Sequence, residues 1–129
     1  MILGVGVDLV DVHRMERVLR CRWGARFIAR VFSDEEIAVC SSTPQPAQGY
    51  AARFAAKEAL AKSLGTGFSK GVSPGRIVVR GGERRPPHIM LLGKTQELAE
   101  SMHVTAIHVS LSHTPQTACA MVVLEKEDS

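Results

Sequence analysis

Two carboxylates in this sequence have surroundings that suit a bound cation. The run Gly4–Val10 alternates as a strand does and places Asp8 on one face with two glycines. Glu58 lies on the side of a predicted helix that carries Phe54, one turn before Lys62. Carboxylate oxygens suit Mg²⁺, which binds one or two of them, keeps waters and accepts phosphate oxygens. The pair therefore predicts a magnesium site for a phosphate-bearing substrate.

Each carboxylate also has a purely structural interpretation, which stays open here. Asp8 stands at the end of a strand and before a helix, where aspartate is a typical helix cap. Glu58 and Lys62 have the i,i+4 spacing of a weak ion pair on an exposed helix face. A strand face without side chains also lets another group approach the backbone closely, and a carboxylate in that gap has room to meet a ligand.

Basic and hydroxyl side chains near these carboxylates are candidates to bind the rest of such a substrate. Arg53, Lys57 and Lys62 lie on the predicted helix, and Ser112 and His113 lie at the end of a predicted strand. The glycine-rich stretch 65–75 follows the helix. It lacks the spacing of a Walker loop and is weak support for a phosphate site by itself.

The elements that position these residues alternate between helical and strand patterns. An alanine-rich helix over 47–64, closed by Gly65, is the longest signal, and Ser33 with Glu36 forms a capping box that starts a short helix. A helix from Asp11 has arginines on one side. Further strands are predicted at 76–80, 88–92, 106–112 and 118–124, with a helix at 94–102 and a turn at 114–117. This order predicts an α+β fold.

Composition sets limits on the class of protein. A length of 129 residues favours one domain, 1–129, and 22% charged with 45% hydrophobic residues is typical of a globular chain. We expect no membrane span, because no apolar run approaches about 20 residues. No signal peptide is visible, which favours a cytoplasmic protein. Cys21, Cys40 and Cys119 have no paired spacing and are expected to be reduced thiols.

Positive charge is concentrated in one region. Between Arg14 and Arg30 there are six arginines and one acid, although the net charge of the whole chain is only +3. Arg14, Arg17 and Arg20 lie on the expected exposed face of the first helix. This cluster predicts an acidic partner, and an exposed basic face with no partner is the alternative.

Three segments together resemble a known family. They are Gly4-Val-Gly-Val-Asp8-Leu-Val with Arg14 following, Phe54-Ala-Ala-Lys57-Glu58-Ala-Leu-Ala-Lys62-Ser-Leu-Gly65-Thr-Gly67, and Val109-Ser-Leu-Ser-His113-Thr114. Their order and spacing resemble the signature blocks of the holo-[acyl-carrier-protein] synthases, the short 4′-phosphopantetheinyl transferases. The resemblance implies an antiparallel sheet with a long central helix in a half-ferredoxin-like arrangement. It also implies a homotrimer with active sites between neighbouring subunits.

The resemblance implies a reaction and roles for particular residues. The 4′-phosphopantetheine arm of coenzyme A would pass to a serine of an apo acyl carrier protein, with release of adenosine 3′,5′-bisphosphate, in support of fatty acid biosynthesis. Asp8, Glu58 and Lys62 match the catalytic positions, and Asp8 with Glu58 would bind Mg²⁺. The implied coenzyme A site comprises Arg53, Lys62, Gly65, Ser112 and His113. The implied docking site for the carrier protein comprises Arg14, with Arg17 and Arg20 on the same face.

Some alternatives remain open at this level. The acceptor of the serine proton is either a metal-bound water or hydroxide, or Glu58 acting through water. A basic nucleic-acid-binding module and a catalytically idle trimeric subunit are the rival functions. The first is disfavoured because aromatic residues make up only 5% of the chain and the arginines are confined to one stretch. The acyl carrier proteins that are accepted, and the use of acyl-coenzyme A, are not decided by the sequence.

Overall fold

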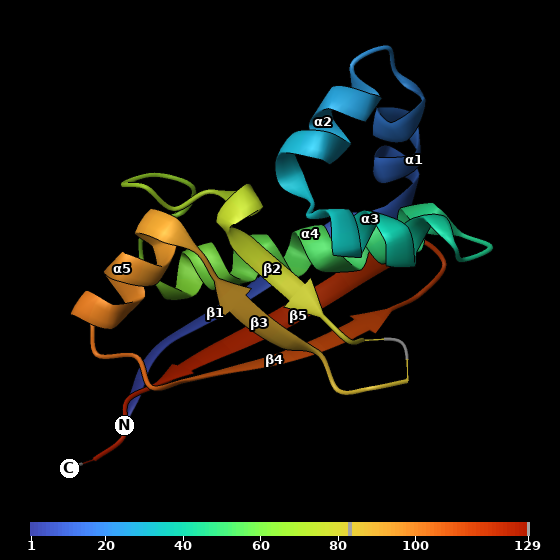
Figure 1. Ribbon diagram of the computed structural model, residues 1–129. Coiled ribbons are helices and arrows are strands. Elements are labelled where there is room, and N and C mark those ends of the chain that lie inside the picture. The colour runs from blue at the N-terminus through green and yellow to red at the C-terminus, as the bar shows by residue number, and fades with distance from the viewer. Residues whose placement is uncertain (83, 129) are drawn as a thin grey trace.

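The computed structural model describes residues 1–82 and 84–128. It has an α+β fold in which a long helix is surrounded by shorter elements (Figure 1). The strands are β1 (Ile2–Asp11), β2 (Ile77–Arg80), β3 (His88–Leu91), β4 (Ala106–His113) and β5 (Thr117–Glu125). The helices are α1 (Val12–Arg20), α2 (Gly24–Val31), α3 (Asp34–Ser41), α4 (Pro46–Ser63) and α5 (Gly93–Ser101), with a 3₁₀ turn η1 (Pro74–Arg76). The predicted strands and the predicted long helix are confirmed to within a few residues.

The strands form two antiparallel sheets. A three-stranded sheet has the order β1-β5-β4, and β2 pairs with β3 in a second sheet. The predicted turn joins β4 to β5, where Thr114 N–H donates to the Thr117 carbonyl at 2.8 Å. The two chain ends lie together at one end of the three-stranded sheet (Figure 1). This sheet is the surface on which α4 packs.

Two glycines let α4 approach β1 at backbone distance. A Cβ atom on Gly4 would lie 2.0 Å from the carbonyl oxygen of Ser63, and one on Gly6 would lie 1.9 Å from that of Ala59. Such distances are shorter than any real Cβ contact, so only glycine fits at both positions. The group that approaches this bare strand face at Gly4 and Gly6 is helix α4.

The other face of β1 is exposed and apolar. Val5, Val7 and Leu9 are 53%, 56% and 67% exposed, and Met121, which pairs with Val7 across the sheet, is 48% exposed. We call this set the outer face. The alternation along β1 is therefore confirmed, but its valine side points away from α4 and its glycine side points toward it.

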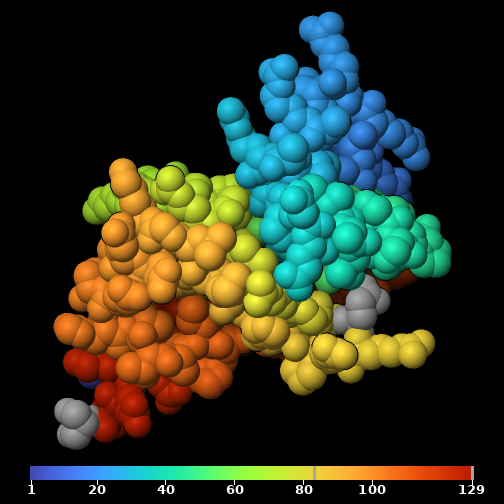
Figure 2. Space-filling view, viewed as in Figure 1, coloured from blue at the N-terminus to red at the C-terminus, as the bar shows by residue number. Residues whose placement is uncertain are grey.

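Helices α1 and α2 form a lobe that stands away from the sheets (Figure 2). Val12 and Met15 of α1 are buried against α4, as the helical pattern predicts. Asp11 caps α1 by accepting from His13 N–H at 3.1 Å, so the interpretation of Asp8 as the cap was wrong. Helix α2, which begins at Gly24, was not predicted from the sequence. Within the described ranges, no helix is long and apolar enough to cross a membrane.

Candidate active site

Asp8 lies where β1 meets α4, on the same face as the two glycines. Its side chain is only 9% exposed, and the Lys62 ammonium donates to its Oδ1 at 2.8 Å. Lys62 Nζ also donates to the Val7 carbonyl at 3.3 Å. When Glu58 is ionised, Oδ2 of Asp8 is buried and has no hydrogen-bond donor among the described residues. A buried carboxylate oxygen without a donor is unfavourable unless a cation or a ligand reaches it.

Glu58 lies beside Asp8 and is half-buried. Burial, a hydrogen bond with Asp8 and the negative charge of Asp8 raise the pKa of Glu58 to about 7, against weaker opposing effects of Lys62 and Arg14. Asp8 raises the pKa of Lys62, the only basic side chain in direct contact with it among the described residues. Lys62 therefore pairs with Asp8, and the alternative ion pair of Glu58 with Lys62 is not among the ion pairs of the described residues.

These side chains make a site with excess negative charge. The described residues contain no group of three or more His, Cys, Asp and Glu side chains that could hold a metal ion. The donors are therefore two carboxylates, one with a free oxygen and one that is hard to ionise. A dication that keeps waters and binds substrate phosphates fits this donor set, whereas a cation enclosed entirely by protein does not.

An apolar cavity of about 440 Å³ lies next to Glu58. Helix α2, which sequence reasoning missed, contributes Phe27 to its wall, and the neighbouring Trp23 is 53% exposed. Phe54 and Glu58 from α4 and Arg14 from α1 also line the cavity. The apolar residues of 24–31, Phe27 among them, recur at helical spacing, and this pattern is the sequence signal that would have predicted the helix. The cavity offers space for an apolar group beside the carboxylates.

Arg53 and His113 line a separate hollow of about 500 Å³. Arg53 is 4% exposed and donates to the carbonyls of Gly49 at 3.3 Å and Gly81 at 3.1 Å. Arg53 and Glu58 are five positions apart on α4, so their side chains leave the helix about 140° apart. The structure therefore does not bring Arg53 and His113 together with the carboxylates in one chain.

The other candidate residues have distinct places. Gly65 follows α4 with a φ of 82°, a conformation that favours glycine. Ser112 pairs with Cys119 on the outer face, so it does not line the hollow that His113 lines. Arg14, Arg17 and Arg20 are exposed along α1, and Arg14 reaches the rim of the cavity beside Glu58.

Lys57 does not bind substrate in this structure, which corrects its place among the candidates. Its side chain is fully buried and forms an ion pair with Glu36 at 3.0 Å. Burial lowers the pKa of Lys57 below its ordinary value, and Glu36 opposes that shift. Lys57 precedes Glu58 by one position, so it leaves α4 about 100° away from it.

Comparison with known proteins shows that the chain is a phosphopantetheinyl transferase. The family model of the 4′-phosphopantetheinyl transferase superfamily matches residues 4–121, and the chain belongs to this superfamily. It is 45% identical over 125 residues to the holo-[acyl-carrier-protein] synthase of Syntrophus aciditrophicus (strain SB), covering 97% of each chain.

Solved structures give the same result for the fold. The holo-[acyl-carrier-protein] synthase from Neisseria meningitidis superposes with a TM-score of 0.88 at 32% identity, covering 98% of this chain and 100% of that one. A holo-(acyl-carrier-protein) synthase from Bacillus anthracis, in complex with CoA (3′,5′-ADP), superposes with a TM-score of 0.79 at 32% identity, covering 98% and 99%. The α+β fold and the family resemblance expected from the sequence are confirmed.

Proposed function

We propose that this protein transfers the 4′-phosphopantetheine arm of coenzyme A to a serine of an apo acyl carrier protein, which releases adenosine 3′,5′-bisphosphate. It is an enzyme of the holo-[acyl-carrier-protein] synthase type, and its product supports fatty acid biosynthesis. The observation that carries the proposal is the cluster of Asp8, Glu58 and Lys62 where β1 meets α4, in a chain so similar to named synthases. We place the reaction in the cytoplasm, where coenzyme A is available, and treat residues 1–129 as one domain.

Asp8 and Glu58 would hold Mg²⁺ together with the pyrophosphate of coenzyme A. Oδ2 of Asp8 is the oxygen that is free for a cation, while Oδ1 keeps its bond to Lys62. The cation, when bound, would neutralise negative charge on the phosphoryl group under attack. Lys62 is 54% exposed and can place its ammonium against a phosphate oxygen of the leaving nucleotide. The nucleophile belongs to the carrier protein, so this chain needs only to position the two substrates and to neutralise the charge on the phosphoryl group.

We propose that the complete site forms between two copies of the chain, in a homotrimer. Arg53 and His113, the residues proposed for the nucleotide end, line a different hollow from the one beside Glu58. Ser112 lies on the outer face, which is apolar and exposed across β1 and β5. Exposed apolar patches of this kind mark protein interfaces. Association through the outer face would bury this surface, and a shared site would unite Arg53, Gly65, Ser112 and His113 with the carboxylates.

The acyl carrier protein is proposed to dock on α1. Arg14, Arg17 and Arg20 present positive charge to solvent, and Arg14 continues that surface to the cavity beside Glu58. Acyl carrier proteins are acidic, so complementary charge would speed their encounter with α1 and orient the serine toward the site. A nucleic-acid-binding function is not proposed, because it gives no role to Asp8 and Glu58.

Mass spectrometry tests the proposed reaction directly. An apo acyl carrier protein is incubated with this chain, coenzyme A and Mg²⁺, beside a matched sample that contains EDTA. We expect the carrier protein to gain the mass of one phosphopantetheine only in the sample without EDTA. No gain with several carrier proteins would contradict the proposed function, and a gain in EDTA would contradict the proposed Mg²⁺ alone.

A further inference from the structure

Helix α4 carries a buried ion pair that the proposed chemistry does not use. Lys57 Nζ lies 3.0 Å from Oε1 of Glu36, and both side chains are 0% exposed. A buried charge is strongly unfavourable unless its partners satisfy it completely. The hydrogen-bond partners of Lys57 and Glu36 therefore decide whether this buried pair is satisfied.

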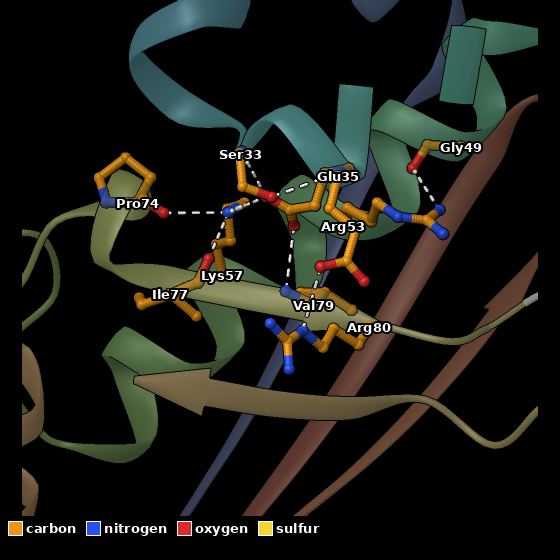
Figure 3. A network of polar contacts seen from close by, with 10 residues as sticks. Ser33, Glu35, Gly49, Arg53, Lys57, Pro74, Ile77, Val79 and Arg80 are labelled. Carbon is orange, nitrogen blue, oxygen red and sulfur yellow. Dashed lines mark hydrogen bonds and ion pairs between the residues drawn. The ribbon is translucent and has the colours of Figure 1, made fainter. Parts of the chain in front are cut away.

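The Lys57 ammonium has an acceptor for each of its three hydrogens. It donates to Glu36, to the carbonyl of Pro74 at 3.0 Å and to the carbonyl of Ile77 (Figure 3). The ring of Phe32 lies 5.4 Å from the same nitrogen. One lysine on α4 is thus bound to α3, to η1 and to the first residue of β2.

The Glu36 carboxylate is equally well satisfied. Oε1 also accepts from Ser33 N–H at 2.8 Å, and Oε2 accepts from Val79 N–H at 3.0 Å. The predicted capping box of α3 is therefore confirmed, and its glutamate has a second role. Because the ligands come from separate elements, Lys57 can occupy this position at only one rotation of α4 about its own axis.

The alanines on the buried surface of α4 do little to select a rotation, because small, similar side chains make shallow ridges. The larger buried side chains of Tyr50, Arg53 and Leu60 add to the selection that the Lys57–Glu36 pair makes. Apart from Lys57, Arg53, Tyr50, Leu60 and Ser63, the buried side chains of α4 are all alanines: Ala47, Ala51, Ala52, Ala55, Ala56, Ala59 and Ala61. Gly4 and Gly6 of β1 set how close α4 lies, but as residues without side chains they present nothing that interlocks with it.

We propose that Lys57 and Glu36 are positioning residues: their buried ion pair fixes the rotation of α4 and thereby directs Glu58 toward Asp8. The proposal rests on the proposed function in so far as these two carboxylates form the reacting site. Such a pair adds little to stability, because apolar side chains of similar volume often replace a buried ion pair without loss. Its effect is on geometry, and a displacement of about 1 Å at a reacting group can lower a rate by about 100-fold.

The test removes both charges and keeps the volume, in the double variant K57M with E36Q. The matched control is E35Q with R80M. That pair also links α3 to β2, with Glu35 Oε2 3.2 Å from Arg80 Nε, but it is exposed and does not involve α4. For each protein we would measure the thermal midpoint, kcat and KM for transfer to the carrier protein, and the crystal structure.

We expect the double variant to fold with a lower thermal midpoint than the parent, because the carbonyls of Pro74 and Ile77 lose the donor that Lys57 provides. In its crystal structure the Glu58 carboxyl should move relative to Asp8 by about 1 Å, and kcat should fall about 10- to 100-fold. KM for the carrier protein should stay within about twofold, because α1 keeps its arginines. The control should match the parent in every measurement.

An unchanged arrangement of Asp8 and Glu58 in the folded double variant would overturn the proposal, whatever the activity. If K57M with E36Q does not fold, K57M with E36M is subjected to the same structural criterion. A parent protein that transfers no phosphopantetheine would contradict the proposed function instead, and the crystal structures would still decide whether the ion pair sets the rotation of α4.

Discussion

The ammonium nitrogen of Lys62 lies 2.8 Å from Oδ1 of Asp8, although 54 positions separate the two residues. This contact joins β1 to α4 at the place where Glu58 also lies. It occupies one oxygen of Asp8 and leaves the other without a donor among the described residues. The ion pair therefore orients Asp8 and leaves Oδ2 available to a cation.

Removing either carboxylate charge should abolish most of the transfer. We expect D8N and E58Q each to lower kcat by about 100-fold or more, because each removes a proposed ligand of the cation that neutralises the phosphoryl group. The far-ultraviolet circular dichroism should stay as in the parent. Transfer is followed by mass spectrometry of the carrier protein, and normal rates in either variant would refute the metal assignment.

The raised pKa of Glu58 predicts how stability depends on pH in the absence of a divalent cation. With a folded-state pKa of about 7 and an ordinary value of 4.5, the folded protein holds this proton more tightly than the unfolded chain. The resulting stabilisation is present below pH 4.5 and is lost as the pH rises to about 7. We expect the thermal midpoint of the parent to fall relative to that of E58Q between pH 5 and pH 8.

A divalent cation should reverse this trend, because it favours the ionised form of Glu58. Added Mg²⁺ with coenzyme A should therefore raise the thermal midpoint more at pH 8 than at pH 5, and E58Q should lose most of that difference. Equal shifts at both pH values in the parent would show that Glu58 is not part of the binding site.

Gly6 should not tolerate a methyl group. G6A places a Cβ 1.9 Å from the Ala59 carbonyl oxygen, which forces α4 away from β1, and we expect a loss of about 1–3 kcal/mol or more in the free energy of unfolding. The obstacle is backbone, so adding A59G should bring no recovery. Urea denaturation measures both variants, and recovery in the double variant would show that the methyl of Ala59 was the obstacle.

The arginines of α1 should act on the carrier protein and not on coenzyme A. We expect R14A with R17A to raise KM for the carrier protein and to make that KM less sensitive to salt, because the complementary charge is lost. The matched control is R84A with R85A, which removes the same charge from exposed positions outside α1. A KM that depends on ionic strength as in the parent would exclude docking on α1.

A site shared between subunits predicts complementation. H113A and D8N should each be inactive, because each removes one part of the proposed site. Mixed and allowed to reassemble, the two variants should recover part of the activity, since some sites then combine an intact Asp8 from one copy with an intact His113 from another. Light scattering would report the assembly, and the absence of recovery in mixed trimers would place both residues in the same protomer.

The outer face should hold that assembly together. Val7 is 56% exposed and pairs with Met121 in the centre of the apolar surface. V7D adds a charge there, and we expect it to give monomers that bind the carrier protein but transfer poorly. A V7D protein of unchanged mass in light scattering would exclude this face as the interface.

Local sequence patterns predicted much of the fold. The alternation of β1, the capping box of Ser33 and Glu36, and the glycine after α4 were all predictable, because each depends on neighbours in the chain. Helix α2 was missed because a glycine marks the start of some helices as well as the end of others. The strand alternation and the helix position selected the carboxylates Asp8 and Glu58 as candidates, and the resemblance implied their roles.

Local sequence patterns could not predict the contacts between distant parts of the chain. Nothing near Lys57 indicates that its partner is a capping glutamate 21 positions earlier, or that two carbonyls complete its shell. The partner of Gly6 was equally hidden, since a bare strand face is compatible with a ligand or with a helix. Both cases depend on which element the fold brings to that face, which is a property of the whole chain.

The two faces of β1 make this segment sensitive to a shift in phase. Insertion or deletion of one residue before Asp8 would exchange the faces and turn valine side chains toward the α4 backbone, where only glycine fits. A two-residue change would restore the phase. Length variation in this part of the chain should therefore be tolerated only in even steps that keep glycine opposite Ser63 and Ala59, a constraint that a library of insertions and deletions in β1 would reveal.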